Sequence, residues 1–519
     1  MNASEFTDIT IIGQHIDTLQ DWNNAQVSST VLLQKVNEIE SEFLAIDLTA
    51  QSTDYQTIYY YTKANYLTVL LEIASKHYCK IQDRTPFSKF PSFDEMRMDY
   101  TVQRLSYFRK AIELYDTSTD SKISKIWMLQ VHTNLANLYH ETGRIVESIA
   151  VLEPIKLSLD MALGNYAARL YALSAHSLDE SEQKEALIES ELHYQFLIEK
   201  YHPSSTMPED IYRSFCQAKE YVQQLITQKY EQIKLYTDFP DSEIEELRLP
   251  QQDYRIWCRE KQLALSFRNI YQKKSNVDDL HIPNMGIGYF SADNTLSYYS
   301  WFNTLKQEFN MARYFLYLAD EGFDGIDTHE SQRDILLINT LDYPAVGYRS
   351  ELIKTSLKTA YGILDKVGML CSDFARGKNQ KTSKISFESW YKGIEQEISL
   401  HSYFSPLYWV AKDLAYKDGS FKTFRRLRNT IEHRYLRILD HCSTPLDEEL
   451  ADEDKMEYRV GYSDLCLQAL QVLQLVRAVL FYTVFAFNSC YKNAMDECKN
   501  SNKIFIPLSL DVYDDEWKN

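Results

Sequence analysis

The sequence predicts an all-α protein, and three features of its composition support this. Glycine and proline, the residues that most often end helices, number only 14 and 12 among 519 residues. Hydrophobic residues make up 45% of the chain and recur in long amphipathic stretches, as in helices that bury one face. Tyrosine is abundant at 38 residues, which suits helix-on-helix packing with hydroxyl groups at groove edges. The chain exceeds the length of one ordinary core, so we expect two or three domains.

The first half of the chain is predicted to consist of helical hairpins. Within residues 133–152, Ala136, Tyr139 and Gly143 recur at spacings of three and four, followed by Ser148 and Leu152. The segment resembles a tetratricopeptide repeat (TPR), in which a small residue lets paired helices approach and glycine permits the turn. Degraded versions lie at residues 111–115 and 166–172. We therefore expect a TPR-like helical-repeat array over residues 1–275, with ordinary helical hairpins as the alternative for the less regular parts.

A domain boundary is expected where residues that disfavour helix gather. Phe239-Pro240-Asp241 and Leu249-Pro250 interrupt helical patterns, and residues 275–295 are rich in asparagine, aspartate and glycine. Beyond this break, helices are predicted over about 297–321, 349–374, 391–416, 421–441 and 462–491. They would form a second, C-terminal domain of residues 296–515.

The most apolar stretch of the chain, residues 465–487, belongs to the last of these helices. Its longest run without a charged or amide side chain, 478–487, is too short to span a bilayer. We expect it to be the central buried helix of a bundle. No association with a membrane is expected.

Charge is unevenly distributed along the chain. The net charge of −19 argues against a general nucleic-acid coat, which needs a broad basic surface. Residues 417–437 are an exception: seven basic residues oppose only Asp418 and Glu432, a local charge of 7 − 2 = +5 without histidine. Any contact with RNA is therefore expected within this segment. The alternative is a basic helix face paired with acidic neighbours.

Other parts of the sequence indicate neither a metal site nor a cofactor. The eight cysteines are scattered without a C-x-x-C pair, which fits neither a zinc site nor a disulfide framework. The acidic stretch 447–454 lacks the spacing of a calcium loop and is predicted to be a solvated connector. No P-loop, G-x-S-x-G or H-E-x-x-H motif is present, and no signal peptide is visible. We expect a cytoplasmic protein that uses no metal ion or cofactor.

The most informative segment is residues 428–433, Arg-Asn-Thr-Ile-Glu-His. Arginine offers a permanent planar charge for a phosphate, and histidine can move a proton near neutral pH. On the predicted helix an apolar stripe faces a core, and a separate polar ridge is formed by Arg426, Asn429, His433 and Arg437. Five positions on an ideal helix place Arg428 roughly 140° around from His433. One copy of the segment is therefore an incomplete site, which a long side chain or a second copy would complete.

Arg428 and His433, with a polar residue directly after the arginine, resemble the R-x4–6-H signature of HEPN domains (higher eukaryotes and prokaryotes nucleotide-binding). Residues 360–368, 406–414 and 427–435 are similar to helices of bacterial HEPN proteins that carry a helical-repeat arm. The resemblance covers roughly residues 300–510. It implies a C-terminal HEPN helical bundle that pairs about a two-fold axis, so that two copies of the motif share one cleft. Active members are metal-independent endoribonucleases, many of them toxins or effectors of defence against phage.

The resemblance also implies roles for individual residues. The RNA 2′-hydroxyl would attack the adjacent phosphodiester and leave a 2′,3′-cyclic phosphate, with His433 as general base or acid and Arg428 on the scissile phosphate. Asn429 would orient the histidine or bind a phosphate oxygen, and Glu432 would pair with Arg428 or act on the histidine across a dimer. The remaining arginines are expected to contact the RNA backbone: Arg425, Arg426, Arg434 and Arg437. Candidates to line the cleft are Asp365 and Lys366.

The leading hypothesis is a homodimeric endoribonuclease whose TPR-like arm binds a protein or peptide trigger or inhibitor. A catalytically inactive HEPN-TPR adaptor or regulatory binding protein is the alternative. A third possibility is a helical-repeat regulator that the C-terminal bundle only dimerises. The lack of a recognisable helix-turn-helix in the first hundred residues argues against that third possibility.

Overall fold

The structure, a computed structural model, divides into two compact units. Unit 1 comprises residues 1–141, 151–165 and 415–422, and unit 2 comprises residues 142–150, 166–414 and 423–519. Residues 6–510 are described, except for 82–84, 119, 201–206, 235–248, 273–276, 284–285, 288–291, 323–329, 377–384, 395–401, 418, 420, 441–455, 502–505 and 508–509. Unit 2 includes residues on both sides of the boundary expected at 275–296, so that two-domain division stays a prediction.

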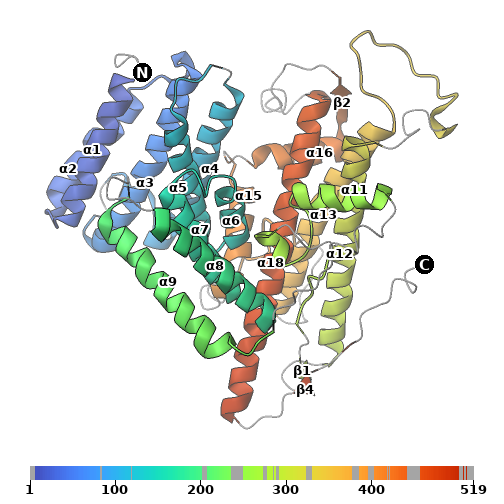
Figure 1. Ribbon diagram of the computed structural model, residues 1–519. Coiled ribbons are helices and arrows are strands. Elements are labelled where there is room, and N and C mark those ends of the chain that lie inside the picture. Colours follow the sequence, from blue (N-terminus) through green and yellow to red (C-terminus); the bar gives the residue numbers. More distant parts are fainter. Residues whose placement is uncertain are drawn as a thin grey trace. The chain divides into compact units, whose positions relative to one another are not determined.

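The predicted all-α class is confirmed, since helices dominate both units (Figure 1). The helices that lie wholly in unit 1 are α1 Thr7–Asn24, α2 Ser29–Leu44, α3 Thr53–Ile81, α4 Phe93–Thr117 and α5 Lys125–Glu141, with the short 3-10 helices η1 Leu48–Ala50 and η2 Phe87–Lys89. Local sequence explains where some of them begin. The hydroxyl of Ser92 accepts a hydrogen bond from the backbone N–H of Glu95 at 3.2 Å and caps α4.

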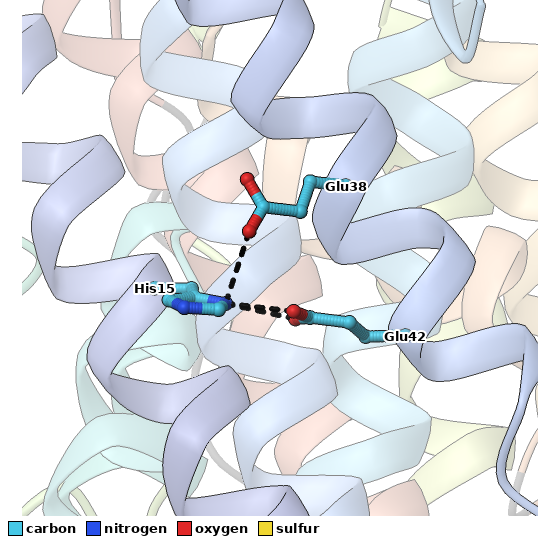
Figure 2. A group of neighbouring side chains, drawn as sticks. All are labelled: His15, Glu38 and Glu42. Atoms are coloured by element: carbon cyan, nitrogen blue, oxygen red, sulfur yellow. Dashed lines mark hydrogen bonds and ion pairs between the residues drawn. The ribbon is translucent and has the colours of Figure 1, made fainter.

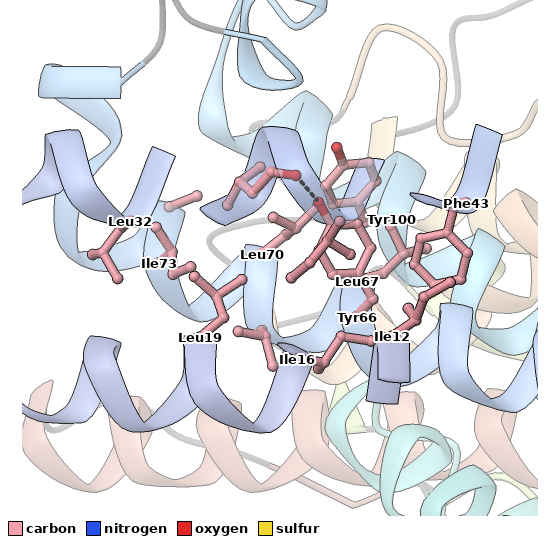
Figure 3. Close-up of a cluster of buried hydrophobic side chains, with 14 of the residues drawn as sticks. Ile12, Ile16, Leu19, Leu32, Phe43, Tyr66, Leu67, Leu70, Ile73 and Tyr100 are labelled. Carbon is pink, nitrogen blue, oxygen red and sulfur yellow. Dashed lines mark hydrogen bonds between the residues drawn. The ribbon is translucent and has the colours of Figure 1, made fainter. Parts of the chain in front are cut away.

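The core of unit 1 is formed by apolar side chains spaced three and four apart on α1, α2 and α3 (Figure 3). On α1 these are Ile12, Ile16 and Leu19, and each is at most 5% exposed. Leu32 and Phe43 of α2 face them, and Tyr66 and Leu70 of α3 close the cluster. This periodicity is the reason that one face of each helix is buried.

Unit 2 begins at the predicted TPR-like turn. Gly143 has a φ of +76°, a conformation that favours glycine, and a Cβ there would lie 3.1 Å from Pro406 Cγ. The helices that follow in the chain are α6 Ile145–Leu152, α7 Asp160–Ser174, α8 Glu180–Lys200, α9 Glu209–Tyr230 and α11 Leu249–Glu260, then η3 Arg268–Ile270. Leu249-Pro250, expected to interrupt helix, instead opens α11, where proline is tolerated in the first turn. Whether these helices form TPR-like repeats stays a prediction.

The second half of unit 2 is built on three long helices that pack against one another: α12 Ala292–Asp320, α13 Tyr348–Arg376 and α18 Tyr462–Ser501 (Figure 1). These confirm three of the predicted helices. The shorter elements are η4 Glu330–Gln332, η5 Ser402–Phe404, α15 Ser405–Ala415 and α16 Lys422–His433. Of the helix predicted over 391–416, Ser405–Ala415 is confirmed, whereas residues 391–393 form a turn. Residues 395–401 lie outside the described residues. The acidic stretch 447–454 lies outside the described residues.

Helix α18 is the buried central helix that the sequence predicted. It is the one helix among the described residues that is long and apolar enough to cross a membrane, and 83% of its most apolar window is buried inside the protein. Its polar residues are used internally: Arg477 donates hydrogen bonds to the backbone carbonyls of Ala264 at 2.9 Å and Asn269 at 3.0 Å. Burial lowers the pKa of Arg477 to about 10. Such a helix is typical of a protein core.

The prediction of one long helix over 421–441 is wrong. Helix α16 ends at His433, and strand β2 (Tyr435–Leu439) follows, in a parallel pair with β3 (Glu457–Gly461). Leu436 and Ile438 alternate into the core at 8% and 3% exposure, while Tyr435 is exposed, so the period is two rather than 3.6. A second small pair, β1 (Gly286–Ile287) and β4 (Ile506–Pro507), is antiparallel. The predicted ridge is therefore broken, because Arg437 lies on a strand.

Candidate functional site: the Arg428–His433 segment

Helix α16 presents one buried face and one exposed face. Phe424, Leu427 and Thr430 are buried, so they hold the helix in the core of unit 2 at spacings of three. Asn429 is exposed and so is His433, whose side chain is 72% accessible to solvent. Arg428 lies between the two faces, with 33% of its side chain exposed. The predicted difference in orientation between Arg428 and His433 is therefore present.

A cluster of charged groups surrounds the guanidinium of Arg428. Its Nη2 lies 3.6 Å from Oδ2 of Asp365 on α13, and its Nε lies 3.5 Å from Oε2 of Glu432. The centre of the Tyr361 ring is 5.8 Å from its Cζ. Hydrogen-bonded charge pairs usually lie at about 2.7–2.9 Å, so both carboxylates hold this guanidinium loosely.

Glu432 joins the two predicted catalytic side chains. The Oε2 atom that lies 3.5 Å from Arg428 Nε also lies 3.8 Å from His433 Nε2. This i, i+4 pairing with Arg428 is one of the two roles predicted for this glutamate. Arg428 and His433 point in different directions from the helix, and one carboxylate oxygen of Glu432 lies near both side chains.

The side chain of Asn429 lies against Arg428. Arg428 Nη1 donates to its Oδ1 at 3.4 Å, and no side-chain hydrogen bond joins Asn429 to His433 among the described residues. The amide thus borders the guanidinium rather than the imidazole ring. Its exposure leaves it open to a ligand.

The arginines proposed to contact RNA are largely engaged by other side chains. Arg425 Nη1 lies 3.6 Å from Glu388, and Arg437 contacts Asp342 at 2.6 Å and Glu457 at 3.6 Å. The guanidinium of Arg434 donates to the hydroxyl of Tyr458. Arg426 is half-buried on α16. The local charge of +5 does not include Glu388, Asp342 and Glu457, because these residues lie outside the segment 417–437. Arg425 and Arg437 therefore fit the alternative prediction, in which the basic residues pair with acidic neighbours.

The segment 386–388 completes the cluster through a close approach to α13. A Cβ on Gly368 would lie 2.8 Å from Phe387 Cα, so the absence of a side chain lets the two backbones meet. The backbone N–H of Phe387 donates to Oδ1 of Asp365 at 3.0 Å, which places Glu388 next to Arg425. Burial raises the pKa of the Glu388 carboxyl, and the nearby Arg425 opposes this rise.

Several members of this cluster were not predicted as site residues. Asp365, predicted to line the cleft, reaches Arg428, whereas Lys366, with the same predicted role, pairs with Glu308 of α12. Glu388 and Tyr361 were missed. Burial raises the pKa of Tyr361 well above its ordinary value, and its buried hydroxyl has no hydrogen-bond partner among the described residues. Tyr361 is identified only by its contact with Arg428 in space, and Glu388 only by its contact with Arg425.

The comparison with protein families bears on this part of the chain. Residues 290–489 match the family model described as LA2681-like HEPN. This HEPN segment contains α12, α13, α15 and α16, most of α18 and every residue of the Arg428 cluster. The match supports assignment to the HEPN superfamily, which includes ribonucleases, and leaves the N-terminal arm unassigned. No match to the chain was found among curated proteins or solved structures.

Proposed function

We propose that the HEPN segment is a metal-independent endoribonuclease with Arg428 and His433 as its catalytic pair. The observation that carries the proposal is that one Glu432 oxygen lies 3.5 Å from the arginine and 3.8 Å from the histidine. An exposed imidazole beside a loosely held guanidinium provides the two functions that RNA cleavage by the 2′-hydroxyl needs.

In this reaction His433 removes the proton of the 2′-hydroxyl. The 2′-oxygen then attacks the phosphorus, the bond to the 5′-oxygen breaks, and a protonated imidazole returns a proton to the leaving 5′-oxygen. Arg428 offsets the negative charge that builds up on the phosphate oxygens. The products are a 2′,3′-cyclic phosphate and a 5′-hydroxyl. Asn429 would add a hydrogen bond to a phosphate oxygen, and Glu432 orients both catalytic side chains.

A homodimer is part of the proposal, and an exposed apolar segment beside the motif supports it. This segment, residues 335–346, contains no charged residue between Ile335 and Leu341. Two of its side chains, Leu336 and Ile338, are 96% and 90% exposed. Other exposed apolar residues in it are Ile335, Leu337, Leu341, Tyr343 and Val346. Exposed apolar surface of this kind marks an interaction site.

The apolar segment is attached to the strand that follows the motif helix. Asp342 pairs with Arg437 at 2.6 Å, and the backbone N–H of Ala345 donates to the carbonyl of Ile438 at 2.8 Å. An uncharged surface suits the self-association of a chain with a net charge of −19, because two such copies repel elsewhere. Pairing through this segment would bring a second motif toward the first, which an incomplete single-copy site requires.

We further propose that the protein acts in the cytoplasm as a toxin or anti-phage effector and that its TPR-like arm binds a protein or peptide regulator. The alternative is an inactive HEPN-TPR adaptor. The contacts of Arg425 and Arg437 with acidic side chains favour that alternative, since they reduce the basic surface available to RNA.

Incubation of the purified protein with total RNA in EDTA separates the two functions. A nuclease leaves fragments with 2′,3′-cyclic phosphate ends, detected by their resistance to ligation until the phosphate is removed. Comparison with His433→Ala and Arg428→Ala tests the assigned pair. Intact RNA, or equal cleavage by wild type and both variants, would contradict the proposal.

A further inference from the structure

Three side chains that can bind a metal ion converge between α1 and α2 of unit 1 (Figure 2). His15 comes from α1, and Glu38 and Glu42 lie one helical turn apart on α2. One ligand atom from each of the three lies within 4.8 Å of the others. All three side chains are partly exposed, so an ion and its water ligands can reach them.

The separations between the possible ligand atoms are close to those found around a bound metal ion. His15 Nδ1 lies 2.8 Å from Oε1 and 3.0 Å from Oε2 of Glu42, and 3.9 Å from Oε1 of Glu38. Tetrahedral Zn²⁺ with ligands at about 2.0–2.1 Å separates neighbouring ligand atoms by about 3.3 Å. The separations from His15 to the two glutamates differ from that value by about 0.3–0.6 Å, and the ligand atoms of the two glutamates lie within 4.8 Å of each other.

The two helices hold these ligands on a rigid base. Ile12 and Ile16 are buried on the same turns of α1 as His15, while Ile39 and Phe43 are buried next to the two glutamates on α2. All four belong to one core cluster. Ligands on packed helices are better organised for binding than ligands on loops.

We propose that His15, Glu38 and Glu42 form a binding site for a late first-row divalent cation, with Zn²⁺ as the representative ion. An imidazole together with carboxylates suits zinc, whereas Mg²⁺ and Ca²⁺ prefer all-oxygen ligand sets. Three protein ligands leave a position for water. Bound there, the ion links α1 to α2.

Lys35 is the group that competes with the ion. Its Nζ lies 3.0 Å from Oε1 of Glu38, and the residue is buried at 8% exposure. If the cluster is only a set of ion pairs, Lys35 satisfies Glu38 and His15 satisfies Glu42. Removal of Lys35 therefore distinguishes the two explanations. In a metal site it frees Glu38 to bind the ion, whereas in a set of ion pairs it removes a stabilising contact and creates no affinity for an ion.

The test is a Zn²⁺ titration of the full-length protein against a chromophoric chelator, with the cysteines kept reduced. We expect one site that His15→Ala and Glu42→Gln each weaken by at least about tenfold, while Lys35→Met tightens it. His281→Ala is the matched control, since it removes an exposed imidazole whose ring nitrogen contacts a backbone carbonyl, and it leaves Zn²⁺ affinity unchanged. X-ray absorption at the zinc edge is expected to show nitrogen and oxygen ligands without sulfur.

Thermal unfolding gives a second measurement. Zn²⁺ raises the unfolding temperature of the wild type because it binds the folded state, and this rise is lost in His15→Ala although the variant folds in EDTA. No Zn²⁺ site in the wild type, sulfur ligation, or equal affinity in wild type and both ligand variants would overturn the proposal. The ligands belong to unit 1 and the Arg428 cluster to unit 2, so neither result depends on RNA cleavage.

Discussion

Arg144 and Asp413 form a fully buried ion pair between residues 269 positions apart in the sequence. Arg144 Nη1 donates to Asp413 Oδ2 at 2.6 Å, and neither side chain is exposed to solvent. Glu147 also pairs with Arg144 and accepts a hydrogen bond from the hydroxyl of Tyr482 at 3.3 Å. Within unit 2, the turn before α6 is thereby joined to α15 and α18.

Replacement of Asp413 by alanine is expected to lower the free energy of unfolding by about 3–5 kcal/mol, because the buried Arg144 loses a charged partner. Urea unfolding followed by tryptophan fluorescence measures the loss. The double variant Arg144→Met/Asp413→Leu should lose less than the single one. Glu113→Gln, which breaks an exposed pair with Lys110, is the control, at less than about 1 kcal/mol. If Asp413→Ala and the control lower the free energy of unfolding equally, the buried ion pair does not contribute to stability as proposed.

His433→Ala is expected to slow RNA cleavage by about 10²–10⁴-fold through loss of proton transfer. Arg428→Ala should slow it by about 10²–10³-fold through loss of charge stabilisation. Single-turnover rates on a defined RNA in EDTA measure both effects. Arg97→Gln, an exposed arginine on α4 that pairs with Asp94, should retain full activity. A decrease that is the same in all three variants would point to general loss of charge rather than to catalysis.

Leu336→Asp and Ile338→Asp are expected to convert the proposed dimer to a monomer, because each places a charge in the exposed apolar segment. Light scattering coupled to size-exclusion chromatography measures the mass, and cleavage should fall with the dimer. Leu192→Asp replaces an exposed leucine on α8 and should leave the mass unchanged. A wild type that is monomeric at every concentration, or a dimer that persists in both segment variants, would argue against this interface.

Two glycines of α13 provide a matched pair. Gly368→Ala puts a Cβ 2.8 Å from Phe387 Cα and should destabilise the fold by about 1–3 kcal/mol, with loss of the Arg425–Glu388 contact. Gly362→Ala meets no atom within 4 Å and should stabilise the helix by about 0.5–1 kcal/mol. Denaturant midpoints measure both changes. If both variants change in the same direction, the close approach of segment 386–388 is not what requires glycine at position 368.

Glu182 makes stability depend on pH. Burial raises its pKa from 4.5 to about 7, although the hydroxyl of Ser177 donates to it at 2.6 Å. Between these values the folded state holds a proton that the unfolded state releases, so the free energy of unfolding falls as pH rises, by at most about 1.4 kcal/mol per pH unit. Glu182→Gln should remove this decrease. Glu199→Gln, an exposed site on the same helix, should keep it when unfolding is measured from pH 4.5 to 8.

Local sequence was sufficient for the long helices but not for the end of the motif helix. Apolar spacing on α12, α13 and α18 repeats over many turns, so a local pattern identifies them. Residues 435–439 are compatible with both a helical and a strand period, and the pairing of Tyr435 with Glu457 decides between them. The partner strand β3 begins at Glu457, 18 residues after β2 ends, so a pattern within residues 435–439 does not show that the pairing exists.

The sequence by itself determined the helical class, the buried apolar helix α18, the HEPN resemblance and the separate orientations of Arg428 and His433 on α16. These properties depend on composition and on positions a few residues apart. Only the tertiary structure placed Asp365 beside Arg428 and Glu388 beside Arg425, and so changed an apparently free basic segment into a set of ion pairs. The physical reason is that Coulomb interactions act over distance in space, whereas a sequence count weighs only neighbours along the chain.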